Sequence, residues 1–139
     1  MEHLNPEILK AFFEGRLSSS GLGRQVQLAI SPDLQFGNKA ITDDLNEDFV
    51  VREDHLVALC DAVLDGDLEP SHLETVASSL VSSERFTWNF ENRPNDPINR
   101  VIHAWGTPDL NYRLTKETVM KFRTLIRTGE NNFDEDDRK

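Results

Sequence analysis

The chain has 139 residues, a length typical of one globular domain with a single hydrophobic core. Its 25 acidic and 15 basic residues give a formal net charge of −10. This charge disfavours binding to nucleic acid or to anionic lipid, because both require clustered Lys and Arg. The single cysteine excludes an internal disulfide. The start of the chain lacks a signal-like segment and no apolar run reaches membrane-spanning length, so we expect a cytoplasmic protein.

The N-terminal residues predict a pair of helices. Asn5 is a good N-cap, Pro6 suits the first helical position, and Gly15 is typical of a residue that ends a helix. Apolar residues at helical spacing predict a second helix over 22–30. Some of these apolar residues also alternate with polar ones, which leaves a strand as the alternative.

Residues 53–80 are the most clearly patterned part of the chain. Apolar residues recur at helical spacing on both sides of Gly66, which predicts two helices joined as an antiparallel αα-hairpin. The same helix, Gly-x-Leu turn and helix occur 51 positions earlier, around Gly15. This repeat favours the helix over 22–30 and predicts two similar hairpins packed together. The matching positions are Ala11, Phe12, Phe13, Gly15, Leu17 and Leu22 with Ala62, Val63, Leu64, Gly66, Leu68 and Leu73.

The remaining segments add two C-terminal helices. Residues 33–52 are interpreted as a long connection, and residues 86–90 alternate aromatic and polar side chains as a short extended segment does. Asp96 is the expected N-cap of one further helix and Thr115 the expected N-cap of the last. These two helices should end near Gly106 and Gly129, respectively.

The sequence therefore predicts an all-α protein. Residues 1–133 should form a single domain of five or six helices, built from two αα-hairpins plus the C-terminal helices. Two copies of a hairpin are too few for a solenoid, which needs three or more repeats. Residues 134–139 contain a run of four acids and are expected to form a disordered tail.

No catalytic or metal-binding motif is apparent. None of the histidines has a second ligand at metal-binding spacing, and Cys60 lies on the apolar face of its helix, where a thiol is inert. Residues 18–24 contain Ser and Gly as phosphate-binding loops do, but they do not follow a strand, so an interhelical turn is favoured. We therefore expect no metal, no cofactor and no enzymatic activity. The histidines are His3, His55, His72 and His103.

Acidic charge is concentrated in the middle of the chain. Residues 40–84 contain twelve acids and one base, whereas the last helix is basic. Such a surface can attract a basic protein partner. The alternatives are that the acidic and basic regions neutralise each other within the fold, or that the acids are only solvated. The candidate partner-binding residues are Asp61, Asp65, Asp67 and Glu69, with Glu47 and Asp48 at the flank.

The layout of residues 54–105 provides a further indication. Two amphipathic helices are followed by aromatic residues at Phe86, Trp88 and Phe90, and then by a helix that opens with Asp96-Pro97-Ile98 and closes with Ala104-Trp105-Gly106. This layout resembles the nuclease-colicin immunity proteins, although the paired tyrosines of that family are absent here. The resemblance implies a small acidic inhibitor of a bacterial toxin and transfers no individual site residue.

These observations support two functional hypotheses. The first is a non-enzymatic inhibitor that binds a basic protein, such as a bacterial toxin, through its acidic surface. The second is a structural or adaptor module whose acidic residues serve only solubility. A secreted toxin encoded next to this protein would favour the inhibitor, and a pull-down at low and moderate salt would test for the partner.

Overall fold

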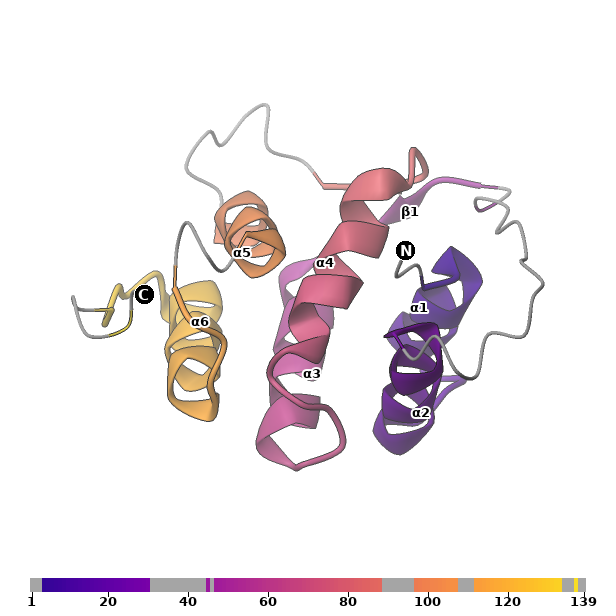
Figure 1. Cartoon of the computed structure of the whole chain (residues 1–139). Helices are drawn as coiled ribbons and strands as arrows, with labels where there is room; N and C mark the ends of the chain where they lie inside the picture. The colour runs from indigo at the N-terminus through magenta and orange to yellow at the C-terminus, as the bar shows by residue number, and fades with distance from the viewer. Residues whose placement is uncertain are drawn as a thin grey trace.

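The structure of the protein is a computed structural model that describes residues 4–30, 45, 47–88, 97–107, 112–133 and 137. This part of the chain is predominantly helical, which confirms the all-α class (Figure 1). It also contains one pair of two-residue strands. The elements in chain order are α1 (Pro6–Phe13), α2 (Ser19–Ile30), β1 (Phe49–Val50), α3 (Glu53–Leu64), α4 (His72–Ser82), β2 (Phe86–Thr87), α5 (Pro97–Gly106) and α6 (Lys116–Thr128).

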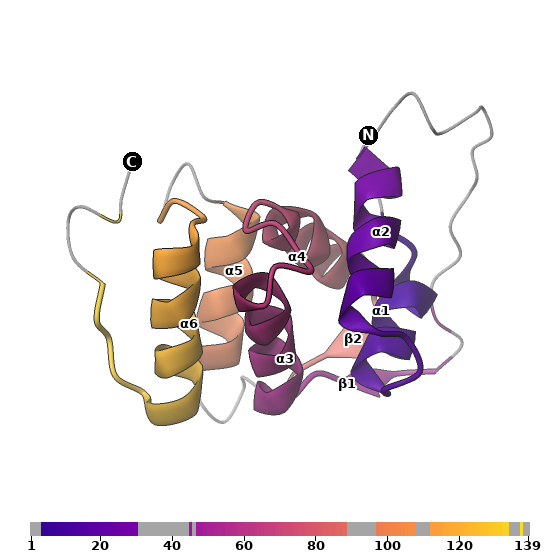
Figure 2. The same ribbon diagram turned by 90° about the horizontal axis from the view of Figure 1, so that it is seen from below.

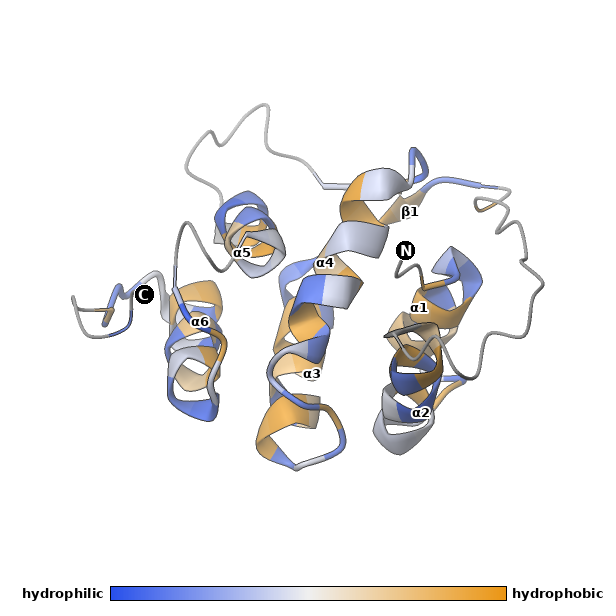
Figure 3. Cartoon of the chain, in the orientation of Figure 1, coloured by the Kyte–Doolittle hydropathy of each residue, from blue (hydrophilic) through white to orange (hydrophobic). Residues whose placement is uncertain are grey.

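The helices α3 and α4 occupy the centre of the molecule. Figures 1 and 2 place α1 and α2 on one side of them and α5 and α6 on the other. Helix α3 packs mainly against α6, and α4 packs mainly against α5 and then α2. Apolar residues are concentrated on the sides of the helices that face one another (Figure 3). Since both central helices have neighbours on more than one side, each buries more than a single apolar stripe.

Both helices of the second predicted hairpin are present, on either side of Gly66. Helices α1 and α2 lie close together, whereas the backbones of α3 and α4 approach each other at few points. Helix α3 lies closest to α6, and α4 lies closest to α5. The nearest neighbours of the two central helices are therefore outside the predicted hairpin.

The repeated Gly-x-Leu turn is present twice, as predicted. Gly15 and Gly66 both adopt positive φ angles, of 82° and 90°, which an L side chain rarely tolerates. After Gly15, the next two backbone amides both donate to the Ala11 carbonyl, at 2.8 and 3.2 Å. After Gly66, the next two amides donate to the Ala62 carbonyl at 2.9 and 3.2 Å. The two turns thus share one hydrogen-bond pattern, although the helices that follow them pack differently.

Capping side chains explain where the helices begin. Asn5 accepts a hydrogen bond from the Glu7 amide at 2.9 Å, as predicted for the N-cap of α1. Helix α2 begins at Ser19, three residues before the predicted start at residue 22. The Ser18 hydroxyl before it accepts a hydrogen bond from the Gly21 amide at 3.1 Å. Residues 22–30 are therefore helical, and the strand alternative is wrong. The Ser- and Gly-rich stretch is the capped start of this helix.

The strands β1 and β2 pair in parallel, with Phe49 opposite Phe86. An aromatic cluster covers them: Phe13 stacks on Phe49 with ring centroids 5.8 Å apart and on His55 at 4.8 Å. The extended segment predicted for residues 86–90 is present at Phe86–Thr87, while residues 89–90 lie outside the described part. Most of the connection predicted at 33–52 also lies outside it, apart from residues 45 and 47–52.

Both ends of the described chain contact the helices. The Leu4 amide and carbonyl bond to the Ser79 hydroxyl of α4, at 3.2 and 3.0 Å. Asp137 departs from the disorder expected of the tail, because it is buried and accepts a 2.7 Å bond from the Lys121 ammonium. Residues 134–136 and 138–139 lie outside the described part. None of the described helices has the length and hydropathy needed to cross a membrane.

Candidate functional site

The turn between α3 and α4 is an exposed acidic feature of the described chain. We call residues 65–71 the acidic turn. Its carboxylates, those of Asp65, Asp67 and Glu69, are all exposed, and none forms an ion pair with a described residue. Hydrophilic residues dominate this turn at the foot of the two central helices (Figure 3). The negative charge at this place is therefore not neutralised by a described residue.

Helix α2 supports the backbone of the acidic turn. A Cβ atom at Gly23 would overlap the carbonyl oxygen of Asp67, so only glycine allows the helix to approach this closely. The Leu68 side chain, between two exposed acids, is buried at 2% exposure. The turn is held in one conformation by the buried Leu68 side chain and by the close contact between Gly23 and the Asp67 carbonyl. Its carboxylates are exposed to solvent.

His72 ties the end of the acidic turn to α2. Its Nδ1 accepts a hydrogen bond from the Glu69 amide at 3.1 Å, and its Nε2 lies 3.3 Å from Oε1 of Gln27. Burial lowers the pKa of His72, against the smaller opposing effect of the Glu69 charge. The neutral imidazole therefore accepts with one nitrogen and donates to Gln27 with the other.

His55 plays the same local role at the start of α3. Its Nδ1 accepts a hydrogen bond from the Arg52 amide at 2.9 Å. Burial lowers its pKa as the largest effect, while Asp54 raises the pKa and Arg52 lowers it further. In both cases the histidine ring accepts a hydrogen bond from the backbone amide three residues earlier, and the histidine amide donates to the carbonyl of that same residue. A ring protonated at Nδ1 cannot accept this hydrogen bond.

We expect the protein to lose stability as the pH falls from about 7.5 to about 5.5. Both histidines have folded-state pKa values below the reference value of 6.5. Below pH 6.5 the unfolded chain binds protons first, so the free energy of unfolding decreases; above it both states are neutral and the stability is complete. Urea unfolding across this pH range should show a shallower pH dependence for H55Q/H72Q than for the wild type. The variant H103Q, which changes an exposed histidine, is the control, and equal slopes for all three proteins would contradict the expectation.

The six predicted partner-binding residues fall at three places. Asp65, Asp67 and Glu69 lie together on the acidic turn. Asp61, one helical turn earlier, accepts a 2.6 Å bond from Nε of Arg123 on α6, so its charge is compensated. The other two, Glu47 and Asp48, are exposed beyond the opposite end of α3. A helix of 12 residues separates them from the acidic turn by about 18 Å, and Asp48 pairs with Arg85 at 3.1 Å.

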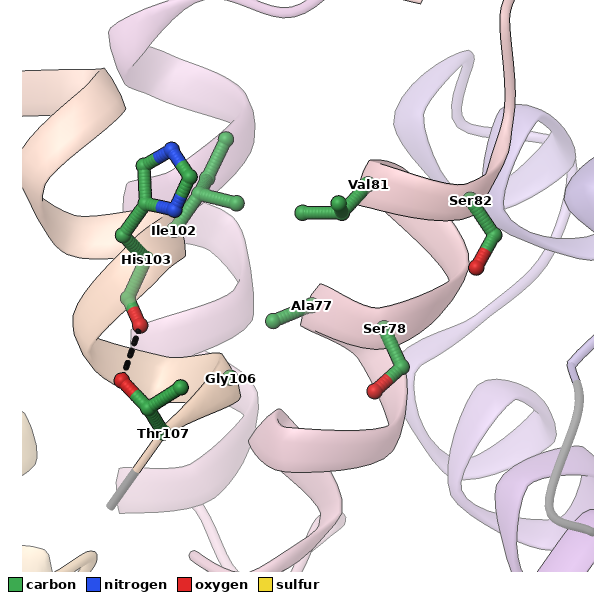
Figure 4. Close-up of a pocket in the computed structure, with 8 residues that line it drawn as sticks. All are labelled: Ala77, Ser78, Val81, Ser82, Ile102, His103, Gly106 and Thr107. Carbon is green, nitrogen blue, oxygen red and sulfur yellow. Dashed lines mark hydrogen bonds between the residues drawn. The ribbon is translucent and has the colours of Figure 1, made fainter. Parts of the chain in front are cut away.

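A pocket of about 230 Å³ lies between α4 and α5 (Figure 4). Its base is apolar, and Ser78 and Ser82 lie across it from His103. No hydrogen bond joins either serine to the imidazole among the residues that line the pocket; the bond drawn there runs from the Thr107 hydroxyl to the His103 carbonyl, at 2.8 Å. Neither serine is therefore paired with the His103 imidazole in this structure.

The Cys60 thiol is buried inside the helical core. Burial, with a smaller contribution from the Asp61 charge, raises the pKa of Cys60 to about 12, so its thiol stays protonated. The described residues contain no group of three or more His, Cys, Asp or Glu side chains that could hold a metal ion. No known protein family, curated protein or solved structure matches the chain significantly.

Sequence reasoning found the acidic residues but not the residues that hold them. The carboxylates were found because charge is visible in the sequence. Gly23 was interpreted as a turn residue, whereas its role depends on an approach by Asp67, which is distant in the sequence. The three-residue spacing between Glu69 and His72 was a usable signal for the cap, but the contact with Gln27 depends on tertiary packing.

Proposed function

We propose that this protein is a non-enzymatic binding protein whose acidic turn contacts a basic protein partner. The observation that carries the proposal is the set of three exposed carboxylates on a turn whose backbone is fixed by α2. No described base neutralises them. The layout resemblance to immunity proteins favours a bacterial toxin as the partner, which a cytoplasmic inhibitor would neutralise by blocking access to it.

The physical basis of the proposal is preorganised charge. Complementary charges accelerate encounter, and a turn that is already rigid loses little conformational entropy on binding. The net charge of −10 extends the attraction beyond direct contact. The other three predicted residues contribute through this longer-range field. Asp61 is engaged in an ion pair with Arg123. Glu47 and Asp48 lie at the other end of α3, where Asp48 pairs with Arg85.

A structural or adaptor role is the second candidate, and one contact favours it. The Asp61–Arg123 pair joins acidic α3 to basic α6, so part of the charge asymmetry is neutralised within the fold. If this neutralisation is the main purpose of the basic helix, the remaining acids serve solubility. The two candidates differ in whether the three carboxylates of the acidic turn are needed for association.

The test removes these three charges. In D65N/D67N/E69Q we expect the association rate with the partner to fall by about tenfold at low salt, because charged interface residues act mainly through the on-rate. The control E7Q/E53Q/E130Q removes three exposed acids elsewhere and should have a much smaller effect. The partner is obtained by affinity capture from the source cells and identified, and association is then measured with the purified partner by surface plasmon resonance.

Three results are informative about this proposal. Raising the salt from about 0.1 M to about 1 M shortens the Debye length from about 10 Å to about 3 Å, so it should slow association of the wild type more than that of the acidic-turn variant. A captured partner that arrests bacterial growth, with rescue by the wild type, would support the immunity role. Equal association rates for the two triple variants would show that only net charge matters and would overturn the proposed site.

A further inference from the structure

A second pocket, of about 400 Å³, lies between α5, α6 and the residues that follow α6. It shares no residue with the acidic turn. Its volume is within the range of pockets that bind small molecules. The residues that line it are Asn99, Arg100, His103, Ala104, Tyr112, Phe122, Leu125, Asn131 and Phe133.

One wall of this pocket is aromatic. The rings of Tyr112 and Phe133 stack with centroids 4.1 Å apart and planes 17° from parallel. The Phe122 ring lies 4.7 Å from Phe133 and is buried at 2% exposure. Leu125 and Ala104, both buried, complete the apolar surface. A flat apolar group is the chemical match for such a wall.

The available polar groups of the pocket are mainly hydrogen-bond donors. The Asn99 Oδ1 accepts a bond from Nε1 of Trp88 at 3.1 Å, and the Asn131 Oδ1 accepts a bond from the Phe133 amide at 3.0 Å. Both partners are N–H groups, so each side-chain oxygen must face its partner and each NH₂ group remains available. Arg100 carries only donors and forms no ion pair with a described residue.

The charge of the lining agrees with this donor bias. No acid is found among the described residues that line the pocket, although the chain as a whole carries 25 acids. The His103 imidazole, also part of the lining, can donate a hydrogen bond. A ligand with oxygen acceptors, and with negative charge near Arg100, would match the donors of Asn99, Arg100 and Asn131.

We propose that this pocket binds a small organic anion: a carboxylate or phosphate group attached to a flat aromatic body. The anionic oxygens accept from Arg100 and from the amides of Asn99 and Asn131. The aromatic body lies against Tyr112, Phe122 and Phe133. This site is independent of the acidic turn, so either proposal can fail without the other.

The test uses the full-length protein and four phenyl probes that differ in charge. Benzoate and phenyl phosphate are the anions, benzyl alcohol is neutral and benzylamine is cationic. Titrations followed by ¹H–¹⁵N NMR should show saturable binding of at least one anion, with shifts in the side-chain NH₂ signals of Asn99 and Asn131. The affinity for benzylamine should be lower by about tenfold or more, because it places a cation beside Arg100.

The variant R100Q should weaken anion binding by about tenfold, because it removes a hydrogen bond between two charged groups. Arg100 is exposed on its helix, so we expect the variant to fold. R127Q, an exposed arginine of α6 that does not line the pocket, is the matched control and should bind like the wild type. A second variant, F133A, should lower the affinity for both anions, because it removes one ring of the stacked aromatic wall. Absence of saturable binding for both anions, equal binding of benzylamine, or unchanged affinity in R100Q would each overturn the proposal.

Discussion

Replacing Gly23 with alanine should lower the free energy of unfolding by about 3 kcal/mol, at the upper end of what overpacking costs. The added Cβ would overlap the Asp67 carbonyl oxygen, which belongs to the backbone and cannot rotate away. Helix α2 or the acidic turn would have to move, although Leu22 and Val26 beside Gly23 are fully buried. Intrinsic helix propensity favours alanine by about 1 kcal/mol. Because the cost of the steric overlap is larger, we expect the net change to be a loss of stability.

Gly106 provides the matched control for this substitution. It also lies in a helix that closely approaches another, but its added Cβ would meet the Ala77 Cβ at 3.7 Å, an ordinary contact. We expect G106A to change the stability by less than about 1 kcal/mol. Urea unfolding monitored by circular dichroism measures both variants. If G23A were as stable as the wild type, the close contact between α2 and the acidic turn would be absent, and the rigid-turn argument would lose its support.

Removing the Trp105 side chain should destabilise the fold even more than the overlap at Gly23. Trp105 is fully buried and packs edge-on against Phe122, with ring centroids 6.0 Å apart. We expect W105A to cost about 4 kcal/mol, because it leaves a large cavity between α5 and α6. The same urea measurement applies, and F122L, which roughly conserves volume, should cost less than about 1.5 kcal/mol.

The indole nitrogen of Trp105 allows a finer test. Its Nε1 is buried and finds no acceptor among the described residues. Burying an unpaired donor costs about 1–3 kcal/mol, and phenylalanine avoids this cost while keeping most of the apolar volume. We therefore expect W105F to cost only about 1 kcal/mol. A loss as large as that of W105A would show that the indole donates a hydrogen bond.

Local features of the fold were predictable because they depend on residues close in sequence. The Asn5 cap, the two Gly-x-Leu turns at Gly15 and Gly66, and the left-handed Gly129 all follow from short-range chemistry. Packing partners were not predictable in this way. The apolar faces of α3 and α4 fit an antiparallel pair equally well, and only the whole structure shows that α6 and α5 cover them.

The candidate site shows the same division. The sequence located the three carboxylates of the acidic turn, but it could not separate them from Asp61. That residue is paired with Arg123, which is 62 positions away. Ion pairs between helices depend on their register and approach, and neither is encoded by local spacing. The donor-rich pocket was missed for the same reason, because it combines residues from α5, α6, the connection between them and the segment that follows α6.

The parallel pairing of β1 and β2 has a consequence for the order of folding. Each strand has only two residues, which is too short to be stable alone. The strands flank the whole segment that contains α3 and α4, so their pairing closes a long loop and must await the docking of both helices. We therefore expect the two strands to pair late in folding. We also expect this pairing to be among the first contacts to open when the native protein fluctuates, and this opening would expose the aromatic cluster of Phe13, Phe49 and Phe86 without global unfolding.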